Sequence, residues 1–204
     1  MRPTAIATLL LVACLPLQAA AQDKASDSTT RTIEAVLTHP VLEGLYTCGE
    51  HAAGELEYLG DDLGQDCMLL EFAFDPMGTE GFPVMFKGDG KNNTDWHGWN
   101  KPVLAPAAGK IVAVKENPVV NTPGATGTPP ASMILLKTDE DVFYVVAHIQ
   151  APKVAAGDTV AAGQAIASVG NNGFGRFPHI HIGAWKGKDA LQIRWDQQKM
   201  TPVK

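Results

Sequence analysis

The chain has 204 residues, of which 45% are hydrophobic and 19% charged, and its formal net charge is −6. This composition is that of a globular protein and excludes a wholly disordered chain. The length suits one ordinary domain with a small extension and is too short for two full-sized domains. Nucleic acid is excluded as a partner, because phosphate binding needs clustered Lys and Arg and the sequence has no such cluster.

The first residues predict an export signal. Arg2 precedes an apolar stretch over residues 4–17, and Ala19-Ala20-Ala21 offers the small residues that a signal peptidase needs. The apolar stretch is too short to span a bilayer comfortably. We therefore expect residues 1–21 to be a signal peptide and the protein to be periplasmic or secreted.

A lipid anchor is the alternative to a soluble exported protein. Leu11-Val12-Ala13-Cys14 resembles a lipoprotein box, in which Cys14 becomes the lipidated first residue and ties the protein to a membrane. The apolar run continues past Cys14, where a tether would turn polar, and this favours the soluble form. A membrane partner is expected only if Cys14 is lipidated.

The segment after the signal predicts a leader and a small extension. Residues 22–32 are rich in Ser, Thr and Asp and are expected to be disordered. Residues 33–86 hold short apolar runs broken by Gly and Asp, which indicates a small β-rich extension. Its cysteines, Cys48 and Cys67, form an even pair in an oxidising compartment, so we expect a disulfide that stabilises the fold by about 3 kcal/mol.

Residues 87–204 predict an all-β domain. Runs at 110–114, 133–136 and 142–146 are rich in β-branched and aromatic residues and are bounded by Gly, Pro and Asp, as strands are. Residues 154–167 carry two tight Ala-Gly turns between short apolar strands. No sustained helical period appears from residue 95 to 182. The pattern predicts an antiparallel β-sandwich or barrel.

Histidines carry the strongest chemical signal. His179 and His181 are two residues apart on an expected strand, so they project from one face while Ile180 and Ile182 enter the core. Two adjacent imidazoles suit a metal ligand beside a general base. His148 ends another expected strand, where a lone His is more often a satisfied core residue.

Four sequence blocks resemble the lysostaphin/LytM-type zinc peptidases in order and spacing. They are Pro102-Val103-Leu104-Ala105-Pro106-Ala107-Ala108-Gly109, Tyr144-Val145-Val146-Ala147-His148, the tandem Ala-Gly turns, and Gly170-Asn171-Asn172-Gly173 leading to Pro178-His179-Ile180-His181. The resemblance covers residues 95–182. It implies a lysostaphin-type metallopeptidase fold for residues 87–204.

The resemblance also implies a mechanism. Asp95 and His181 would be zinc ligands, and His148 and His179 would flank the metal-bound water. Zinc lowers the pKa of bound water to about 7 and so supplies hydroxide at neutral pH. The implied substrate is a peptide of peptidoglycan.

One ligand departs from the family pattern. The family's first ligand is a His four residues before the Asp, and Lys91 stands there, which lowers the expected zinc affinity because a protonated Lys cannot ligate. Three explanations stay open. His97 replaces the ligand, or the site is degenerate, or the Lys91 ammonium itself occupies the metal position beside Asp95.

Candidate substrate contacts surround these residues. Tyr144, Arg176 and Trp185 are predicted to bind substrate, Arg176 by holding a carboxylate. Trp195 and the other tryptophans could form a stacking platform for sugar rings or peptide, although core packing explains any single Trp. Arg194 is a second candidate for a carboxylate contact.

Three functions remain at this point. The first is zinc-dependent endopeptidase action on peptidoglycan. The second is an inactive LytM-like module that binds cell wall or regulates an amidase. The third is a secreted carbohydrate- or protein-binding β domain with chance histidines. The sequence does not predict an oligomeric state.

Overall fold

The structure is a computed structural model that describes residues 32–53, 55–56, 62–74, 77–78 and 81–201. The expected signal peptide, Cys14 and all but the last residue of the expected leader lie outside the described residues. The chain divides into residues 1–32 and Ile33–Lys204, and the second unit is described here by itself. Within the described ranges, no helix is long and apolar enough to cross a membrane.

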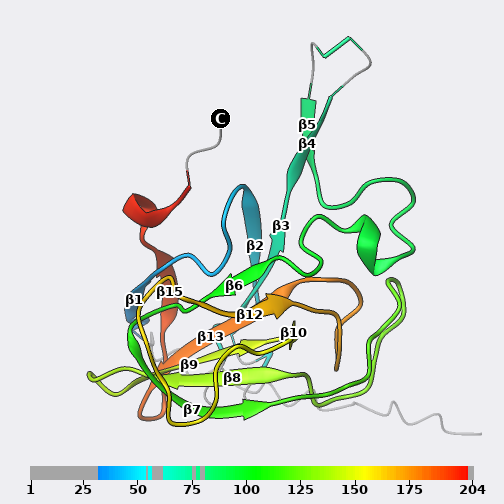
Figure 1. The fold of residues 1–204 in the computed structure, drawn as a ribbon. Coiled ribbons are helices and arrows are strands. Elements are labelled where there is room, and N and C mark those ends of the chain that lie inside the picture. The colour runs from blue at the N-terminus through cyan, green and yellow to red at the C-terminus, as the bar shows by residue number, and fades with distance from the viewer. Residues whose placement is uncertain (1–31, 54, 57–61, 75–76, 79–80, 202–204) are drawn as a thin grey trace, which may run out of the picture. The chain divides into compact units, whose positions relative to one another are not determined.

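The main sheet confirms the predicted all-β, antiparallel fold. Its strands follow the order β11-β7-β8-β9-β13-β3-β2, and β14 pairs with β13 at the side of this path (Figure 1). All of these pairs are antiparallel. The strand bounds are β2 Tyr46–Glu50, β3 Gln65–Leu69, β7 Gly109–Lys115, β8 Met133–Lys137, β9 Val142–Ala147, β11 Thr159–Val160, β13 Ile180–Lys186 and β14 Asp189–Ala190.

A smaller sheet packs against the main one. It contains β10 (Ile149–Gln150), β12 (Ala165–Val169) and β6 (Pro102–Leu104), in that order. Buried apolar side chains of both sheets form one core, including Val103, Ile166, Ile134, Ile180 and Ile182. The described residues also include two 3-10 turns, Asn93–Asp95 and Gln197–Lys199, neither of which contains a buried residue.

Strand alternation gives β9 and β13 two different faces. Ile180 and Ile182 are fully buried in the core, as predicted, so His181 points to the opposite face. On that opposite face Val145, Ala147 and Trp185 form a second apolar cluster. His181 therefore lies on the same face of the sheet as this second apolar cluster.

The predicted extension contributes strands to the fold instead of standing apart from it. The strand β1 (Ala35–Thr38) pairs in parallel with β15 (Gln192–Trp195). The hairpin of β2 and β3 completes the main sheet beside β13. The predicted disulfide is confirmed, with Cys48 and Cys67 directly opposite each other and 2.07 Å between their sulfurs. The boundary at residue 87 stays a prediction.

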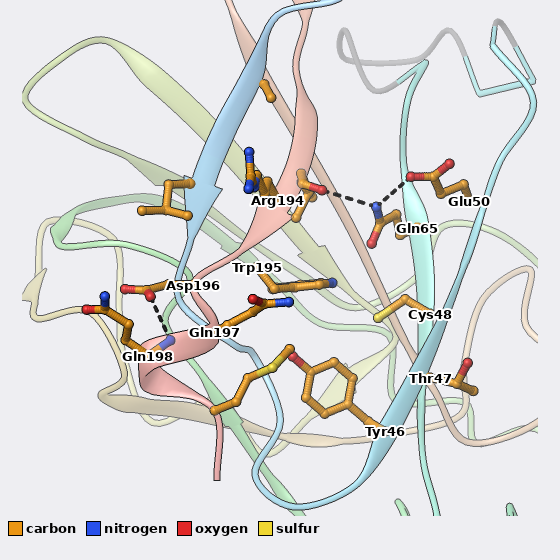
Figure 2. Close-up of a pocket in the computed structure, with 14 residues that line it drawn as sticks. Tyr46, Thr47, Cys48, Glu50, Gln65, Arg194, Trp195, Asp196, Gln197 and Gln198 are labelled. Carbon is orange, nitrogen blue, oxygen red and sulfur yellow. Dashed lines mark hydrogen bonds between the residues drawn. The ribbon is translucent and has the colours of Figure 1, made fainter. Parts of the chain in front are cut away.

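Two further features belong to this part of the chain. A two-stranded arm, β4 (Glu71–Phe74) paired with β5 (Gly81–Val84), continues from β3 away from the main sheet (Figure 1). A cavity of about 1310 Å³ opens between β2, β15 and the C-terminal 3-10 turn (Figure 2).

Candidate metal centre and active site

The structure brings the three histidines of the sequence motifs together. His181 lies on β13, and His179 precedes that strand in a bridge to Gly170. His148 lies between β9 and β10 and has a φ of 60°, which is a left-handed backbone conformation. Ring centroids of His148 and His179 are 4.3 Å apart, and those of His148 and His181 are 6.4 Å apart. All three side chains are buried.

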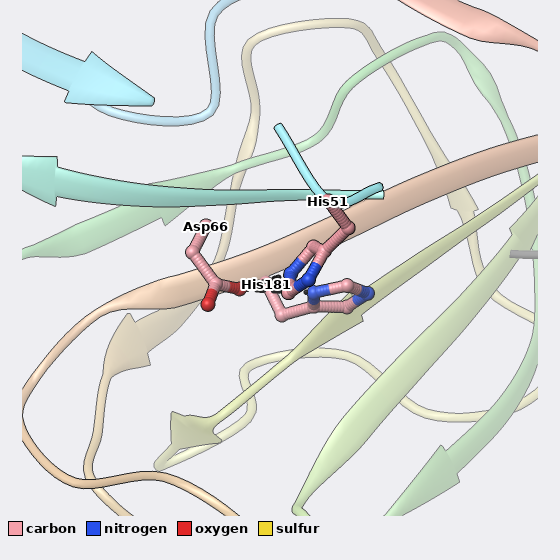
Figure 3. Close-up of side chains that lie close together, drawn as sticks. All are labelled: His51, Asp66 and His181. Atoms are coloured by element: carbon pink, nitrogen blue, oxygen red, sulfur yellow. Dashed lines mark hydrogen bonds and ion pairs between the residues drawn. The ribbon is translucent and has the colours of Figure 1, made fainter. Parts of the chain in front are cut away.

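A hairpin from the predicted extension adds two more ligand side chains. Asp66 lies on β3, in register with Gly49 on β2 and with His181 on β13, and His51 follows the end of β2. One donor atom from each of His51, Asp66 and His181 lies within 4.8 Å of the others (Figure 3). Among the described residues, this is the group that could hold a metal ion.

The carboxylate of Asp66 is the centre of these contacts. Its Oδ1 lies 3.0 Å from Nδ1 of His181 and 3.3 Å from Nε2 of His51, and its Oδ2 lies 3.7 Å from Nε2 of His179. Burial alone would raise the pKa of Asp66. The hydrogen bond from His181 and the charges of the nearby imidazoles outweigh burial and hold this pKa well below its usual value. Asp66 is therefore an anion at neutral pH.

The donor set fits zinc. Two imidazoles and one carboxylate are a known catalytic combination, which leaves a fourth tetrahedral position for water or substrate. Nε2 of His51 is buried, and within the described part of the chain it has no hydrogen-bond partner of acceptable geometry. An imidazole nitrogen left in this state costs free energy unless something binds it. The three residues could therefore hold the metal that the sequence motifs imply.

The other two histidines are held in one tautomer by backbone carbonyls. Nδ1 of His148 donates to the carbonyl of Asn172 at 2.8 Å, and Nδ1 of His179 donates to that of Phe177 at 2.7 Å. A carbonyl only accepts, so the proton of each neutral ring sits on Nδ1. Nε2 of each ring is then the basic nitrogen, and in His179 this atom faces Asp66.

Both of these rings are neutral at pH 7. Burial, followed by the charge of His179, lowers the pKa of His148 to about 3. Burial also lowers the pKa of His179, although the Asp66 carboxylate opposes that shift. A neutral imidazole accepts a proton, as a general base must.

Asn172 and Gly175 hold the loop before His179 in place beside the rings of His148 and His179. The Asn172 side chain accepts from the Ser132 amide at 2.7 Å and donates to the Ile149 carbonyl at 2.7 Å. Gly175 packs against the rings of His148 and His179, where an added Cβ would lie 3.2 to 3.3 Å from ring atoms. A larger residue at Gly175 would push the two rings apart.

Two predicted ligands do not join the cluster. Asp95 ends a 3-10 turn, where its carboxylate accepts from the backbone amide of Asn92 at 2.9 Å, and His97 contacts Glu71 at 3.1 Å. Lys91 is exposed and pairs with Asp89 at 2.7 Å. The prediction applied the family's four-residue spacing to Lys91 and Asp95. In the structure the side chains that lie close to His181 are those of His51 and Asp66, which are separated by 14 residues along the chain.

A signal for the missed pair was present in the sequence. The expected Cys48–Cys67 disulfide places two strands side by side, and His51 and Asp66 lie three residues and one residue from its cysteines. A cross-strand disulfide brings such neighbours close together in space.

The three residues predicted to contact substrate, Tyr144, Trp185 and Arg176, lie in three different environments. Tyr144 is 1% exposed, and its hydroxyl lies 3.4 Å from that of Thr38, so this residue belongs to the core. The alternation of β9 puts Tyr144 on the core face, opposite the histidines. Trp185 lies on the histidine face and stacks on Phe143. Arg176 is exposed and donates to Thr126.

An aromatic stack also adjoins the site. Trp96 stacks on Phe177 with ring centroids 4.9 Å apart, and Phe177 lies 5.2 Å from the ring of His179. Phe86 packs on Trp96 from the side. The segment around Asp95 therefore contributes an aromatic wall beside His179, although Asp95 itself is not part of the His51, Asp66 and His181 group.

The sequence profile of Peptidase family M23 matches residues 92–193, which is half of the chain. This match contains His148, His179 and His181 and begins after His51 and Asp66. No curated protein matches the chain.

Solved structures of peptidases are among the similar folds. A mutant catalytic domain of the prophage-encoded M23 protein EnpA from Enterococcus faecalis is 15% identical, with a TM-score of 0.48, over 76% of this chain and 93% of that chain. The catalytic domain of the antimicrobial peptidase lysostaphin from Staphylococcus simulans is 21% identical, with a TM-score of 0.44, over 72% of this chain and 88% of that chain. From the matching profile, we conclude that the chain belongs to peptidase family M23, a family of metallopeptidases.

Proposed function

We propose that the protein is an exported, zinc-dependent endopeptidase that cleaves peptide bonds of peptidoglycan, with zinc held by His51, Asp66 and His181. The observation that carries the proposal is the convergence of these three donors beside two neutral histidines. Membership of the family supports a peptidoglycan substrate. The disulfide supports export, because disulfides persist in oxidising compartments.

Different residues have different roles in the proposed reaction. Bound zinc would polarise the scissile carbonyl and lower the pKa of a water molecule. His179, whose Nε2 faces Asp66, takes up the proton of the attacking water. His179 then returns this proton to the leaving amine, and the neutral ring of His148, whose centroid lies 4.3 Å away, packs beside it at the reacting centre. The carbonyls of Asn172 and Phe177 orient both rings for these tasks.

The proposal removes the main argument for an inactive module. That alternative rested on Lys91 in place of an expected ligand. With His51 and Asp66 as ligands, the cluster has three protein donors and no ligand is missing. Lys91, paired with Asp89 at the surface, then has no part in metal binding.

Zinc uptake tests the ligand assignment. We expect chelator-stripped protein to bind one zinc per chain, and we expect His51→Ala or Asp66→Ala to weaken binding by at least about 100-fold. His97→Ala and Asp95→Ala are the matched controls and should bind zinc as the unchanged protein does. Calorimetric titration measures all five proteins. Loss of zinc binding in His97→Ala, with normal binding in His51→Ala, would overturn the assignment.

Hydrolysis tests the activity separately. Release of new amino groups from purified peptidoglycan should require zinc and should disappear in His51→Ala. A protein that binds zinc stoichiometrically and releases no amino groups would favour the wall-binding or amidase-regulating module instead.

A further inference from the structure

The long connection between β7 and β8 packs on the loop that precedes His179. This connection comprises residues 116–132 (Figure 1), and the loop, residues 171–177, follows β12. Three backbone hydrogen bonds join the two segments: the amides of Asn121, Gly124 and Gly127 donate to the carbonyls of Asn171, Arg176 and Gly175 at 2.8, 2.8 and 3.3 Å. The shape of the 171–177 loop therefore depends on a segment that is distant from it in the sequence.

The side chain of Asn121 reaches the middle of the 171–177 loop. Asn121 is 7% exposed, and its Nδ2 donates to the carbonyls of Gly173 at 3.0 Å and Gly175 at 2.9 Å. Both N–H groups of the side-chain amide are thereby used. Loss of this amide would deprive two carbonyls of a donor, and a buried carbonyl without a partner costs free energy. The amide therefore holds both carbonyls in place.

The carbonyls that Asn121 binds lie between the two carbonyls that orient the neutral histidines. The latter belong to Asn172 and Phe177, at the two ends of the same loop. Gly175 also packs directly on both rings, because an added Cβ would lie 3.2 to 3.3 Å from their atoms. A shift at the middle of the loop would therefore change the surroundings of both rings.

Two further asparagines connect Asn121 to the aromatic wall. Nδ2 of Asn93 donates to the carbonyl of Asn121 at 2.8 Å, and Nδ2 of Asn171 donates to Oδ1 of Asn93 at 2.8 Å. Asn93 begins the 3-10 turn that precedes Trp96, whose ring stacks on Phe177. Asn121 is thus also joined to the segment that supplies the aromatic wall.

We propose that Asn121 is a positioning residue for the peptidase reaction. Its side-chain amide fixes the 171–177 loop, whose carbonyls keep the proton of each neutral histidine on Nδ1 and leave Nε2 of His179 as the base. A base must lie within hydrogen-bond reach of the proton that it takes, and a displacement of about 1 Å can lower a rate about 100-fold. This inference rests on the proposed function, because His179 acts as a base only in that reaction.

Asn121→Asp tests the role of the amide at constant side-chain size. A carboxyl group donates at most one hydrogen bond, so it cannot serve both carbonyls. We expect kcat for hydrolysis of a soluble peptidoglycan fragment to fall about 10- to 100-fold, with KM changed by less than about threefold. Zinc uptake should stay that of the unchanged protein, because the three proposed ligands lie on the β2–β3 hairpin and on β13.

Gly127→Ala perturbs the same contact and leaves Asn121 unchanged. Gly127 is partly exposed, and a Cβ at this position would overlap the Asn121 side chain. The amide must then move, so kcat should fall in the same way. Because little of the core is touched, this variant should fold even if Asn121→Asp does not.

Asn117→Ala is the matched control in the same connection. Asn117 is partly exposed, and its Nδ2 donates to the carbonyl of Pro130 at 2.9 Å, within the connection itself. Its side chain makes no hydrogen bond to the 171–177 loop among the described residues. This variant should keep the normal kcat and zinc uptake.

The tautomers of the two neutral histidines provide a readout that needs neither zinc nor substrate. Nitrogen NMR spectra of the imidazoles distinguish a proton on Nδ1 from a proton on Nε2. The unchanged metal-free protein and Asn117→Ala should show the proton on Nδ1 of His148 and His179. In Asn121→Asp and Gly127→Ala, part of the protein should carry it on Nε2 of at least one ring.

The combined results decide the proposal. It is supported if kcat falls together with the shift in tautomer while zinc uptake stays normal. It is overturned if Asn121→Asp keeps the normal kcat, or if kcat falls in either variant while both rings keep the proton on Nδ1. If the unchanged protein hydrolyses no peptidoglycan, the proposed function fails, and the imidazole spectra alone decide whether Asn121 orients the rings.

Discussion

The site draws its residues from two regions that are built in different ways. In one, β9 and β13 are adjacent antiparallel strands of the main sheet that present His148, His179 and His181. In the other, the β2–β3 hairpin presents His51 and Asp66, whose separation in the chain is bridged by strand pairing and a disulfide. The first region is organised by local alternation. The second depends on the register of a covalently linked hairpin.

This difference corresponds to a proposed difference in chemistry. The β9–β13 region holds two rings that backbone carbonyls fix as neutral bases. The hairpin adds an anion and an imidazole, which together with His181 form the proposed metal ligand set. His181 is the residue that belongs to both. Catalysis and metal binding should therefore be separable by mutation.

The largest effect should come from the two neutral histidines. His179→Ala should lower the rate of peptidoglycan hydrolysis by about 10²- to 10⁴-fold because it removes the group that takes up the proton, and His148→Ala should also lower it because it removes the ring that packs on His179. Zinc uptake should stay close to that of the unchanged protein. Parallel measurement of rate and zinc content checks this. Equal loss of zinc in His148→Ala and His51→Ala would remove the distinction between the two regions.

The disulfide should have the next largest effect. Replacing both Cys48 and Cys67 by Ser should lower the free energy of unfolding by about 3 kcal/mol, because the unfolded chain is no longer constrained by a loop of 19 residues. Zinc affinity should fall with it, since the hairpin register holds His51 and Asp66. Urea unfolding and zinc titration measure the two effects. Full zinc affinity in the double variant would show that strand pairing alone sets the register.

Acid should destabilise the metal-free protein through the β9–β13 region. The pKa of His148 is about 3 in the folded protein and about 6.5 in the unfolded chain. As pH falls below 6.5, the unfolded chain binds a proton that the folded protein does not, so stability should drop by about 2 kcal/mol between pH 7 and pH 5. Asp66 adds a further loss only below about pH 4. Urea unfolding at each pH measures this.

His148→Asn is the control for the acid effect. It keeps a polar side chain and removes the titrating ring, so its stability should vary less between pH 7 and pH 5. An unchanged pH dependence in His148→Asn would assign the effect to another group.

The smallest effects should come from the residues outside the cluster. Asp95→Ala removes contacts at a short 3-10 turn and should cost about 1 kcal/mol of stability. His97→Ala breaks a contact with the largely exposed Glu71 and should cost no more. Both should hydrolyse peptidoglycan at close to the normal rate. A large rate loss in either variant would indicate that the active site includes the segment around residue 95.

Much of the β9–β13 region was predictable because its information is local. A period of two residues places His179 and His181 on one face and Ile180 and Ile182 in the core, and the structure shows that arrangement. Tyr144 shows the limit of such reasoning. Its place in a motif suggested a substrate contact, whereas alternation along β9 buries it beside Thr38.

The sequence by itself determined the all-β fold class, the Cys48–Cys67 disulfide and the family, because alternation, cysteine pairing and motif order are properties of the chain. Only the tertiary structure decided which residues gather at His181. The disulfide indicates that His51 and Asp66 lie near each other, but only the pairing of β3 with β13 places them beside His181, and the spacing along the chain does not encode that pairing. The same register decides that Gln65 faces a cavity while Asp66, its neighbour, faces the proposed metal.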